Sequence, residues 1–176
     1  MSGGIGTASD DEATGDVLVG IEHLTGSAHD DLLIGTAGNN RLTGGAGDDL
    51  LQGGLGLDTL DGGDGIDLAD YADRTGPVTV NLATGANPDG DVFISIEGAR
   101  GGSGDDTLTG DAGDNRLDGG DGDDILAGGD GNDTLAGGAG ADTIDGVQVS
   151  TSPTMAPTPA GSRWISAPAP VRMATR

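Results

Sequence analysis

The chain has 176 residues, 37 of them Gly and none Cys, and its net charge is −23. Such a charge disfavours nucleic acids and anionic membrane surfaces as partners and favours multivalent cations. The missing cysteines exclude disulfides, no apolar run has the length of a transmembrane helix, and no signal peptide opens the chain.

Residues 1–15 are expected to form a disordered N-terminal segment. The first structured unit is expected over residues 16–70, as a spacer strand followed by a block of repeats. In this block the nine-residue pattern G-G-x-G-x-D-x-(Leu/Ile)-x occurs five times in succession, most clearly in residues 44–52 (GGAGDDLLQ). A fixed short period of this kind indicates a repeat architecture in which neighbouring copies stack on one another.

The second unit covers residues 71–145 and opens with a spacer, after which five more nonapeptides follow from Gly101. In the spacer, Val78, Val80 and Leu82 alternate with polar residues, and residues 92–96 show the same period of two. This alternation predicts two strands. We expect these strands to continue the stack of repeats rather than to form a separate domain.

The two units are copies of one larger duplication. A shift of 75 residues places Asp16 on Asp91 and Glu22 on Glu97, and the match continues to Asp70 against Asp145. Each unit is therefore a spacer followed by five nonapeptides.

The repeat pattern stops at residues 146–176. This segment has no Asp or Glu and holds five of the seven Pro of the chain. This composition predicts a disordered tail. When the codons are read one base earlier, Met155-Ala156 and Met173-Ala174 must each encode Gly, and Trp164-Ile165 must encode Asp. We infer that the tail is a third repeat unit translated out of frame, which explains why no C-terminal export signal is recognisable.

In each nonapeptide the first six residues are expected to turn and the last three to extend, with the apolar eighth residue facing inward. Two nonapeptides per coil would stack every second repeat into two parallel sheets with strands about 4.8 Å apart. The predicted inward residues are Leu33, Leu42, Leu51, Leu60, Ala69, Leu108, Leu117, Leu126, Leu135 and Ile144. The stacking also aligns the sixth-position residues, which are the candidate metal ligands: Asp31, Asn40, Asp49, Asp58, Asp67, Asp106, Asn115, Asp124, Asp133 and Asp142.

Aligned carboxylates on adjacent strands repel each other by about 3 kcal/mol at an effective dielectric constant near 20. A Ca²⁺ ion between successive turns would reverse the sign of this interaction. It would also use backbone carbonyls of the glycine turns among its roughly six to eight oxygen ligands. Because the predicted core is small, folding is expected to be coupled to the binding of several Ca²⁺ ions.

The ten nonapeptides resemble the RTX family of secreted bacterial proteins, also called haemolysin-type calcium-binding repeats. The resemblance implies an all-β, right-handed parallel β-roll that folds on binding calcium outside the cell. It also implies an extracellular location, reached through a type I secretion apparatus that reads a C-terminal signal. The family's motif Asp maps onto the sixth-position residues, and Asn40 and Asn115 depart from it, which predicts weaker sites there.

The leading functional hypothesis is a calcium-binding module, not itself an enzyme, that assists the secretion and stability of a larger exported protein. The chain lacks the Lys of a phosphate-binding loop and the HExxH motif of zinc proteases. Two alternatives remain open. The chain could be the accessory C-terminal part of an RTX enzyme (protease, lipase or polysaccharide epimerase), or part of a surface adhesin.

Overall fold

The computed structural model describes residues 4–7, 21–146 and 163–164, and the regular elements within these residues are all β-strands. The strands are β1 (Gly4–Thr7), β2 (Ile21–Thr25), β3 (Leu32–Ile34), β4 (Arg41–Ala46), β5 (Leu50–Gln52), β6 (Thr59–Asp64), β7 (Leu68–Asp70), β8 (Thr79–Asn81), β9 (Val92–Ile94), β10 (Gly98–Arg100), β11 (Thr107–Thr109), β12 (Arg116–Asp121), β13 (Ile125–Ala127), β14 (Thr134–Ala139), β15 (Thr143–Asp145) and β16 (Arg163–Trp164). Within the described residues there is no helix that could cross a membrane.

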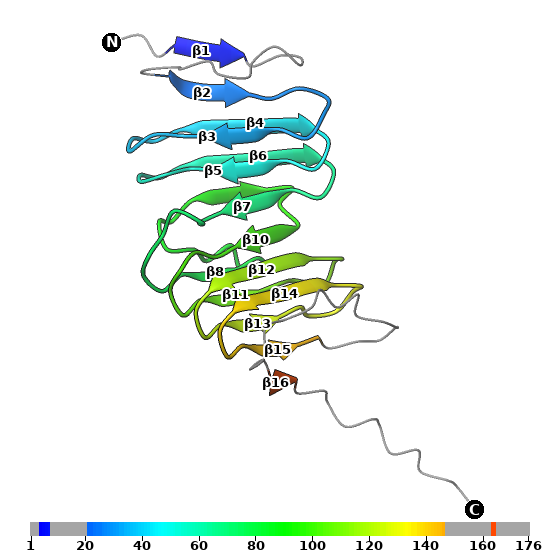
Figure 1. Cartoon of the computed structure of the whole chain (residues 1–176). Coiled ribbons are helices and arrows are strands. Elements are labelled where there is room, and N and C mark those ends of the chain that lie inside the picture. The colour runs from blue at the N-terminus through cyan, green and yellow to red at the C-terminus, as the bar shows by residue number, and fades with distance from the viewer. Residues whose placement is uncertain (1–3, 8–20, 147–162, 165–176) are drawn as a thin grey trace, which may run out of the picture.

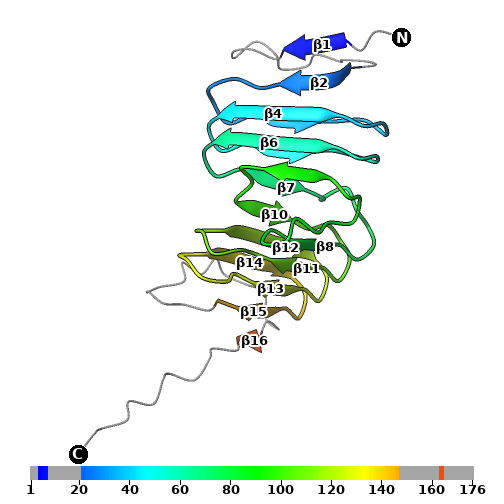
Figure 2. The ribbon, with the colours of Figure 1, turned by 180° about the vertical axis from the view of Figure 1, so that it is seen from behind.

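The strands stack one above another from the N-terminal to the C-terminal end of the molecule (Figure 1), and the view from behind shows the opposite side of the same stack (Figure 2). They form three parallel sheets. The long sheet runs in the order β14-β12-β10-β7-β5-β3 through both blocks. The N-terminal sheet, β1-β2-β4-β6-β9, and the C-terminal sheet, β16-β15-β13-β11-β8, share the other side of the coil. The predicted parallel β-solenoid is therefore confirmed.

Each coil contains two nonapeptides, as predicted. Leu33 pairs with Leu51, Leu42 with Leu60, and Leu108 with Leu126, so paired residues within a block lie 18 positions apart. The eighth-position side chains point into the coil and form its core. Nine of the ten predicted inward residues are buried, and Leu135 is partly buried against the same cluster.

The spacer between the blocks continues the stack. β9 pairs with β6 at the end of the first block, β8 pairs with β11 at the start of the second, and β10 joins β7 to β12 in the long sheet. The two strands predicted from the alternation of apolar residues are present in shorter form. Val80 and Ala99 occupy the inward positions that leucines take in the repeats.

The segments predicted to be disordered lie mostly outside the described residues. In the N-terminal segment, β1 pairs with β2. In the C-terminal segment, β16 pairs with β15. The rest of residues 1–15 and 146–176, apart from Gly146, lies outside the described part of the chain. The limits of the two structured units, 16–70 and 71–145, remain predictions.

Candidate metal sites between stacked turns

The sixth-position residues form continuous columns inside the coil. Eight of the ten are buried, and Asp31 and Asp133 are half-buried. Along a column, the carboxylate of a turn accepts a hydrogen bond from the backbone of the turn 18 residues earlier. The Asp31 N–H donates to Asp49 Oδ1 at 2.8 Å, and the Asp49 N–H donates to Asp67 Oδ1 at 2.8 Å. The stacking of repeats thus brings the candidate ligands of successive turns into direct contact.

The ten turns have two conformations. In an open turn, the glycines at the second and fourth positions both have φ between +94° and +148°, a region that favours Gly. In a closed turn, the second-position N–H donates to the sixth-position side chain at 2.5–2.7 Å. The open turns begin at Gly44, Gly53, Gly62, Gly119, Gly128 and Gly137, and the closed turns begin at Gly26, Gly35, Gly101 and Gly110.

The position of a turn in its stack decides its conformation. Each block has two closed turns followed by three open turns, and every open turn follows another nonapeptide 18 residues earlier. The second-position glycine of an open turn lies against the second-position carbonyl below it. At Gly45, for example, a Cβ atom would collide with the carbonyl of Ser27. The six open turns therefore define six spaces between stacked nonapeptides.

Carboxylate oxygens in the open turns are left without hydrogen-bond partners. Within the described part of the chain, five buried Oδ2 atoms accept no hydrogen bond: those of Asp49, Asp58, Asp67, Asp124 and Asp133. All five belong to open turns. A buried anionic oxygen without a partner is costly, so each of these atoms needs a cation or a proton.

Backbone carbonyls converge on the same points. A Cβ atom on the first-position Gly44 would collide both with Asp49 Oδ2 and with the carbonyl of Gly62 in the next turn. Gly101 and Gly119 have the corresponding neighbours in the second block. Among the described residues, no three acidic or histidine side chains gather around one point. A cation held there would therefore rely on carbonyl oxygens as well as carboxylates, a donor set that suits Ca²⁺.

A second ladder of side chains, which the sequence analysis missed, holds the turns in register. The fifth-position Asp30 Oδ1 accepts the N–H of Asp48 at 2.9 Å, and Asp48 Oδ1 accepts the N–H of Ile66 at 2.9 Å. In this ladder a side chain accepts from the backbone of the following turn, whereas in the sixth-position ladder it accepts from the backbone of the preceding turn. The fifth-position acceptors are Asp30, Asn39, Asp48, Asp105, Asp114 and Asp123.

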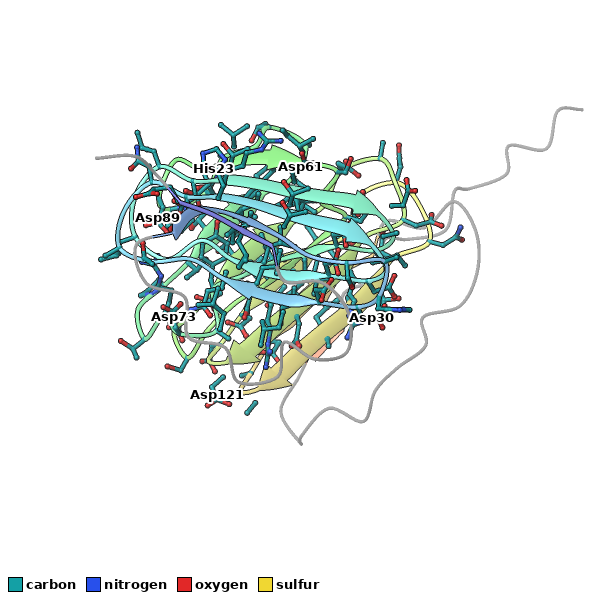
Figure 3. The ribbon with its side chains drawn as sticks, turned by 90° about the horizontal axis from the view of Figure 1, so that it is seen from above. His23, Asp30, Asp61, Asp73, Asp89 and Asp121 are labelled. Carbon is teal, nitrogen blue, oxygen red and sulfur yellow. The ribbon has the colours of Figure 1, made fainter. Side chains whose placement is uncertain are left out.

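The fifth-position ladder marks where a stack ends. Every fifth-position acceptor lies in a turn that another nonapeptide follows 18 residues later. The last turns of the four stacks instead carry Leu57, Ile66, Asn132 and Ala141 at this position. Viewed along the stack, Asp30 lies at the rim of the coil, on the opposite side from Asp73 and Asp89 of the spacer (Figure 3).

The spacer supplies two further members of the columns. Asp91 Oδ1 accepts the N–H of Asp58 at 2.9 Å, and Glu97 Oε2 accepts the N–H of Asp67 at 3.1 Å. Asn115 Nδ2 in turn donates to the Glu97 carbonyl at 3.1 Å, so one column continues from the first block into the second. The sequence contains the signal for Asp91, because residues 91–94 (DVFI) repeat the second half of a nonapeptide.

Burial raises the pKa values of several column carboxylates. It raises the pKa of Asp49 to about 6, and the nearby Asp67 and Asp31 carboxylates add to the effect. It likewise raises the pKa of Asp124 to about 6, with Asp106 and Asp142 as the charged neighbours. The pKa values of Asp58, Asp67, Asp91, Glu97 and Asp133 are raised for the same main reason. A divalent cation beside these carboxylates would stabilise their charged form and so offset both the cost of burial and the repulsion between them.

Without metal, the chain should gain β-structure as the pH falls. The folded-state pKa values of Asp49 and Asp124 lie above the ordinary value of 3.8. Protonation therefore favours the folded chain, fully below about pH 4, and this stabilisation is lost as the pH rises through about 6. Circular dichroism of the calcium-free chain at both pH values measures the change. With saturating calcium the sign should reverse, because protons compete for the ligands. Identical calcium-free spectra at the two pH values would contradict the prediction.

Two glycines at the same position of neighbouring turns should differ in their tolerance of alanine. Gly56, in an open turn, has φ +129°, and a Cβ atom there would lie 2.9 Å from the carbonyl carbon of Gly38. Gly38, in the closed turn below, has only Thr36 Oγ1 nearby, at 3.9 Å. We expect Gly56→Ala to cost about 1–3 kcal/mol and Gly38→Ala less than about 0.5 kcal/mol. Thermal unfolding in saturating calcium measures both, and equal costs would refute the assignment of open and closed turns.

The comparison with known protein families matches the chain to the model of the RTX calcium-binding nonapeptide repeat. The model matches two pairs of overlapping stretches, residues 25–60 and 34–69 and residues 100–135 and 118–147. Together these stretches cover just over half of the chain and leave out the spacer between the blocks. A search of curated proteins gives no match.

Proposed function

The chain belongs to the RTX calcium-binding nonapeptide repeat family, and on this premise we propose that it folds when Ca²⁺ binds in the spaces between its stacked turns. The observation that carries the proposal is the set of buried Oδ2 atoms without partners in the open turns. Each lies beside the first-position glycine of its own turn, and at Gly44 and Gly119 the carbonyl of the next nonapeptide points at the same place. Ca²⁺ is coordinated by hard oxygen ligands of both kinds, carboxylate and backbone carbonyl.

The ten sixth-position residues are the proposed ligands, but their contributions differ. In the open turns, Asp49, Asp58, Asp67, Asp124 and Asp133 each offer an oxygen to which no group in the described part of the chain donates a hydrogen bond. In the closed turns, backbone N–H groups already occupy oxygens of Asp31, Asn40, Asp106 and Asn115. We therefore expect one ion for each of the six spaces between nonapeptides, rather than one for each of the ten turns.

A chain that folds only with calcium would respond to the low calcium of the cytosol and the high calcium outside the cell. Unfolded in the cytosol, it could pass through a type I secretion apparatus, and calcium outside would then fold it. The general secretion of proteins with RTX repeats supports this role and an extracellular location. Solenoids built only of such repeats are typically non-catalytic, which favours a binding and folding role over an enzymatic one.

Counting bound ions tests the proposal. The full chain should be dialysed against buffers of rising free Ca²⁺ and its bound calcium measured at equilibrium. Binding should saturate near six ions per chain, one for each open turn. Mg²⁺ should compete poorly, because it demands a small octahedral site and keeps its waters. A chain that binds no calcium would overturn the proposal.

A further inference from the structure

Arg74, in the spacer, binds a repeat turn with its side chain. Its Nη2 donates to the carbonyl of Gly54 at 2.6 Å and to Asp89 Oδ2 at 2.5 Å. The side chain is 23% exposed, and that of Asp89 is 13% exposed. This ion pair is therefore more sheltered from water than the usual surface salt bridge.

Arg74 binds the carbonyl of Gly54, the second residue of its nonapeptide. In the other stacked turns, this second-position carbonyl has a regular environment. In the stacks of nonapeptides, the second-position carbonyl points at the second-position glycine of the next turn. The carbonyl of Thr36 approaches Gly54 in this way, and that of Gly102 approaches Gly120. Gly54 belongs to the last nonapeptide of its stack. The next turn on this side of the coil lies in the spacer and lacks the glycine pattern. There the Arg74 guanidinium, rather than a glycine, contacts the Gly54 carbonyl.

Carboxylates lie near this junction, as they do at the spaces between nonapeptides. Asp58 is 1% exposed and its Oδ2 accepts no hydrogen bond among the described residues, while its N–H donates to Asp91. Asp91 is buried, and its Oδ2 lies 3.5 Å from the Tyr71 hydroxyl. The junction thus holds the same excess of negative charge that calls for a cation between nonapeptides.

We propose that the Arg74 guanidinium is a resident cation that takes the place of a Ca²⁺ ion at the junction between turn 53–58 and the spacer. This inference rests on the proposed function, because it assumes that the spaces between nonapeptides hold Ca²⁺. A guanidinium supplies positive charge and several N–H donors to carbonyl and carboxylate oxygens. Here it binds the Gly54 carbonyl and Asp89, while Asp58 Oδ2 stays without a hydrogen bond among the described residues.

The backbone of Arg74 extends this role to the second block. Its carbonyl accepts the N–H of Ser103 at 3.0 Å, in the first turn of that block, and its own N–H donates to the Tyr71 carbonyl at 2.9 Å. One residue therefore connects the last turn on one side of the first block to the first turn of the second block. The junction can form without metal, whereas the spaces between nonapeptides cannot.

The test compares Arg74→Ala with Arg41→Ala as a matched loss of one positive charge. Arg41 pairs with Asp61 at 2.7 Å on the outer face and is 45% exposed. Equilibrium dialysis against saturating Ca²⁺, with circular dichroism to monitor folding, gives the number of ions per folded chain. Arg74→Ala should bind one ion more than the wild type and need more calcium to fold. Arg41→Ala should match the wild type in ion number.

Further variants make the result specific. Adding Asp89→Asn to Arg74→Ala should remove the additional ion, and Arg74→Lys, which keeps a cation, should keep the wild-type number. An unchanged ion number in Arg74→Ala, or its failure to fold at any calcium concentration, would overturn the inference. A wild-type chain that binds no calcium would instead overturn the proposed function, so the two failures can be told apart.

Discussion

Without calcium at neutral pH, the chain should be largely unfolded, and added calcium should produce the far-ultraviolet circular dichroism spectrum of a β-protein. The folded coil buries column carboxylates such as Asp49, Asp67 and Asp124, each 1% exposed or less. Their Oδ2 atoms have no hydrogen-bond partner among the described residues. Their raised pKa values show that this environment disfavours the charged form that they carry at neutral pH in the unfolded chain.

The core cannot offset this cost alone, because it consists mainly of two facing rows of leucines and smaller aliphatic residues, with few aromatic side chains. Each bound ion stabilises the folded chain in proportion to the logarithm of the calcium concentration, and several ions add their effects. The expected transition is therefore steep in calcium. The measurement is a calcium titration of the chelator-treated chain, with Mg²⁺ as the control cation. A complete β spectrum in excess EGTA would show that folding does not need the metal.

The sequence predicts the repeat-level features of this fold because each depends on local residue pattern. The 18-residue coil, the inward leucines and the columns of sixth-position residues all follow from the nine-residue period. The distinction between open and closed turns does not. Ser27, Thr36 and Asp111 replace the second glycine in three closed turns, but Gly102 keeps it and its turn is closed as well. What decides the conformation is the turn 18 residues earlier, which composition alone does not report.

The spacer shows the same limit. Asp91 and Glu97 extend the columns although the turns before them lack the glycine pattern, and the turn before Glu97 is shortened, with Ser95 at φ 47°. The contact of Arg74 with Gly54 joins residues 20 positions apart through the packing of the coil. By contrast, the fifth-position ladder could have been found, because Asp or Asn occurs there wherever a further nonapeptide follows in the same stack.

Asp124→Ala should weaken calcium-induced folding far more than Asn40→Ala. Asp124 lies in an open turn with a nonapeptide on either side. Its Oδ1 accepts the N–H of Asp106 at 2.8 Å, its own N–H donates to Asp142 at 3.1 Å, and its Oδ2 is free to bind metal. Asn40 starts its stack in a closed turn, where its neutral Oδ1 accepts the Thr36 N–H at 2.7 Å.

The loss of Asp124 removes a charged ligand and one hydrogen bond of the column, which should raise the calcium midpoint of folding by about tenfold or more. The loss of Asn40 removes hydrogen bonds but no anionic ligand, so its midpoint should shift by less than about threefold. Asp123→Ala is the charge-matched control, because Asp123 is exposed and accepts the register bond from Ala141 at 2.8 Å rather than lying in a column. Its midpoint should stay close to that of Asn40→Ala. Equal midpoints for Asp124→Ala and Asp123→Ala would mean that calcium responds to the overall negative charge of the coil rather than to ligands held between its turns.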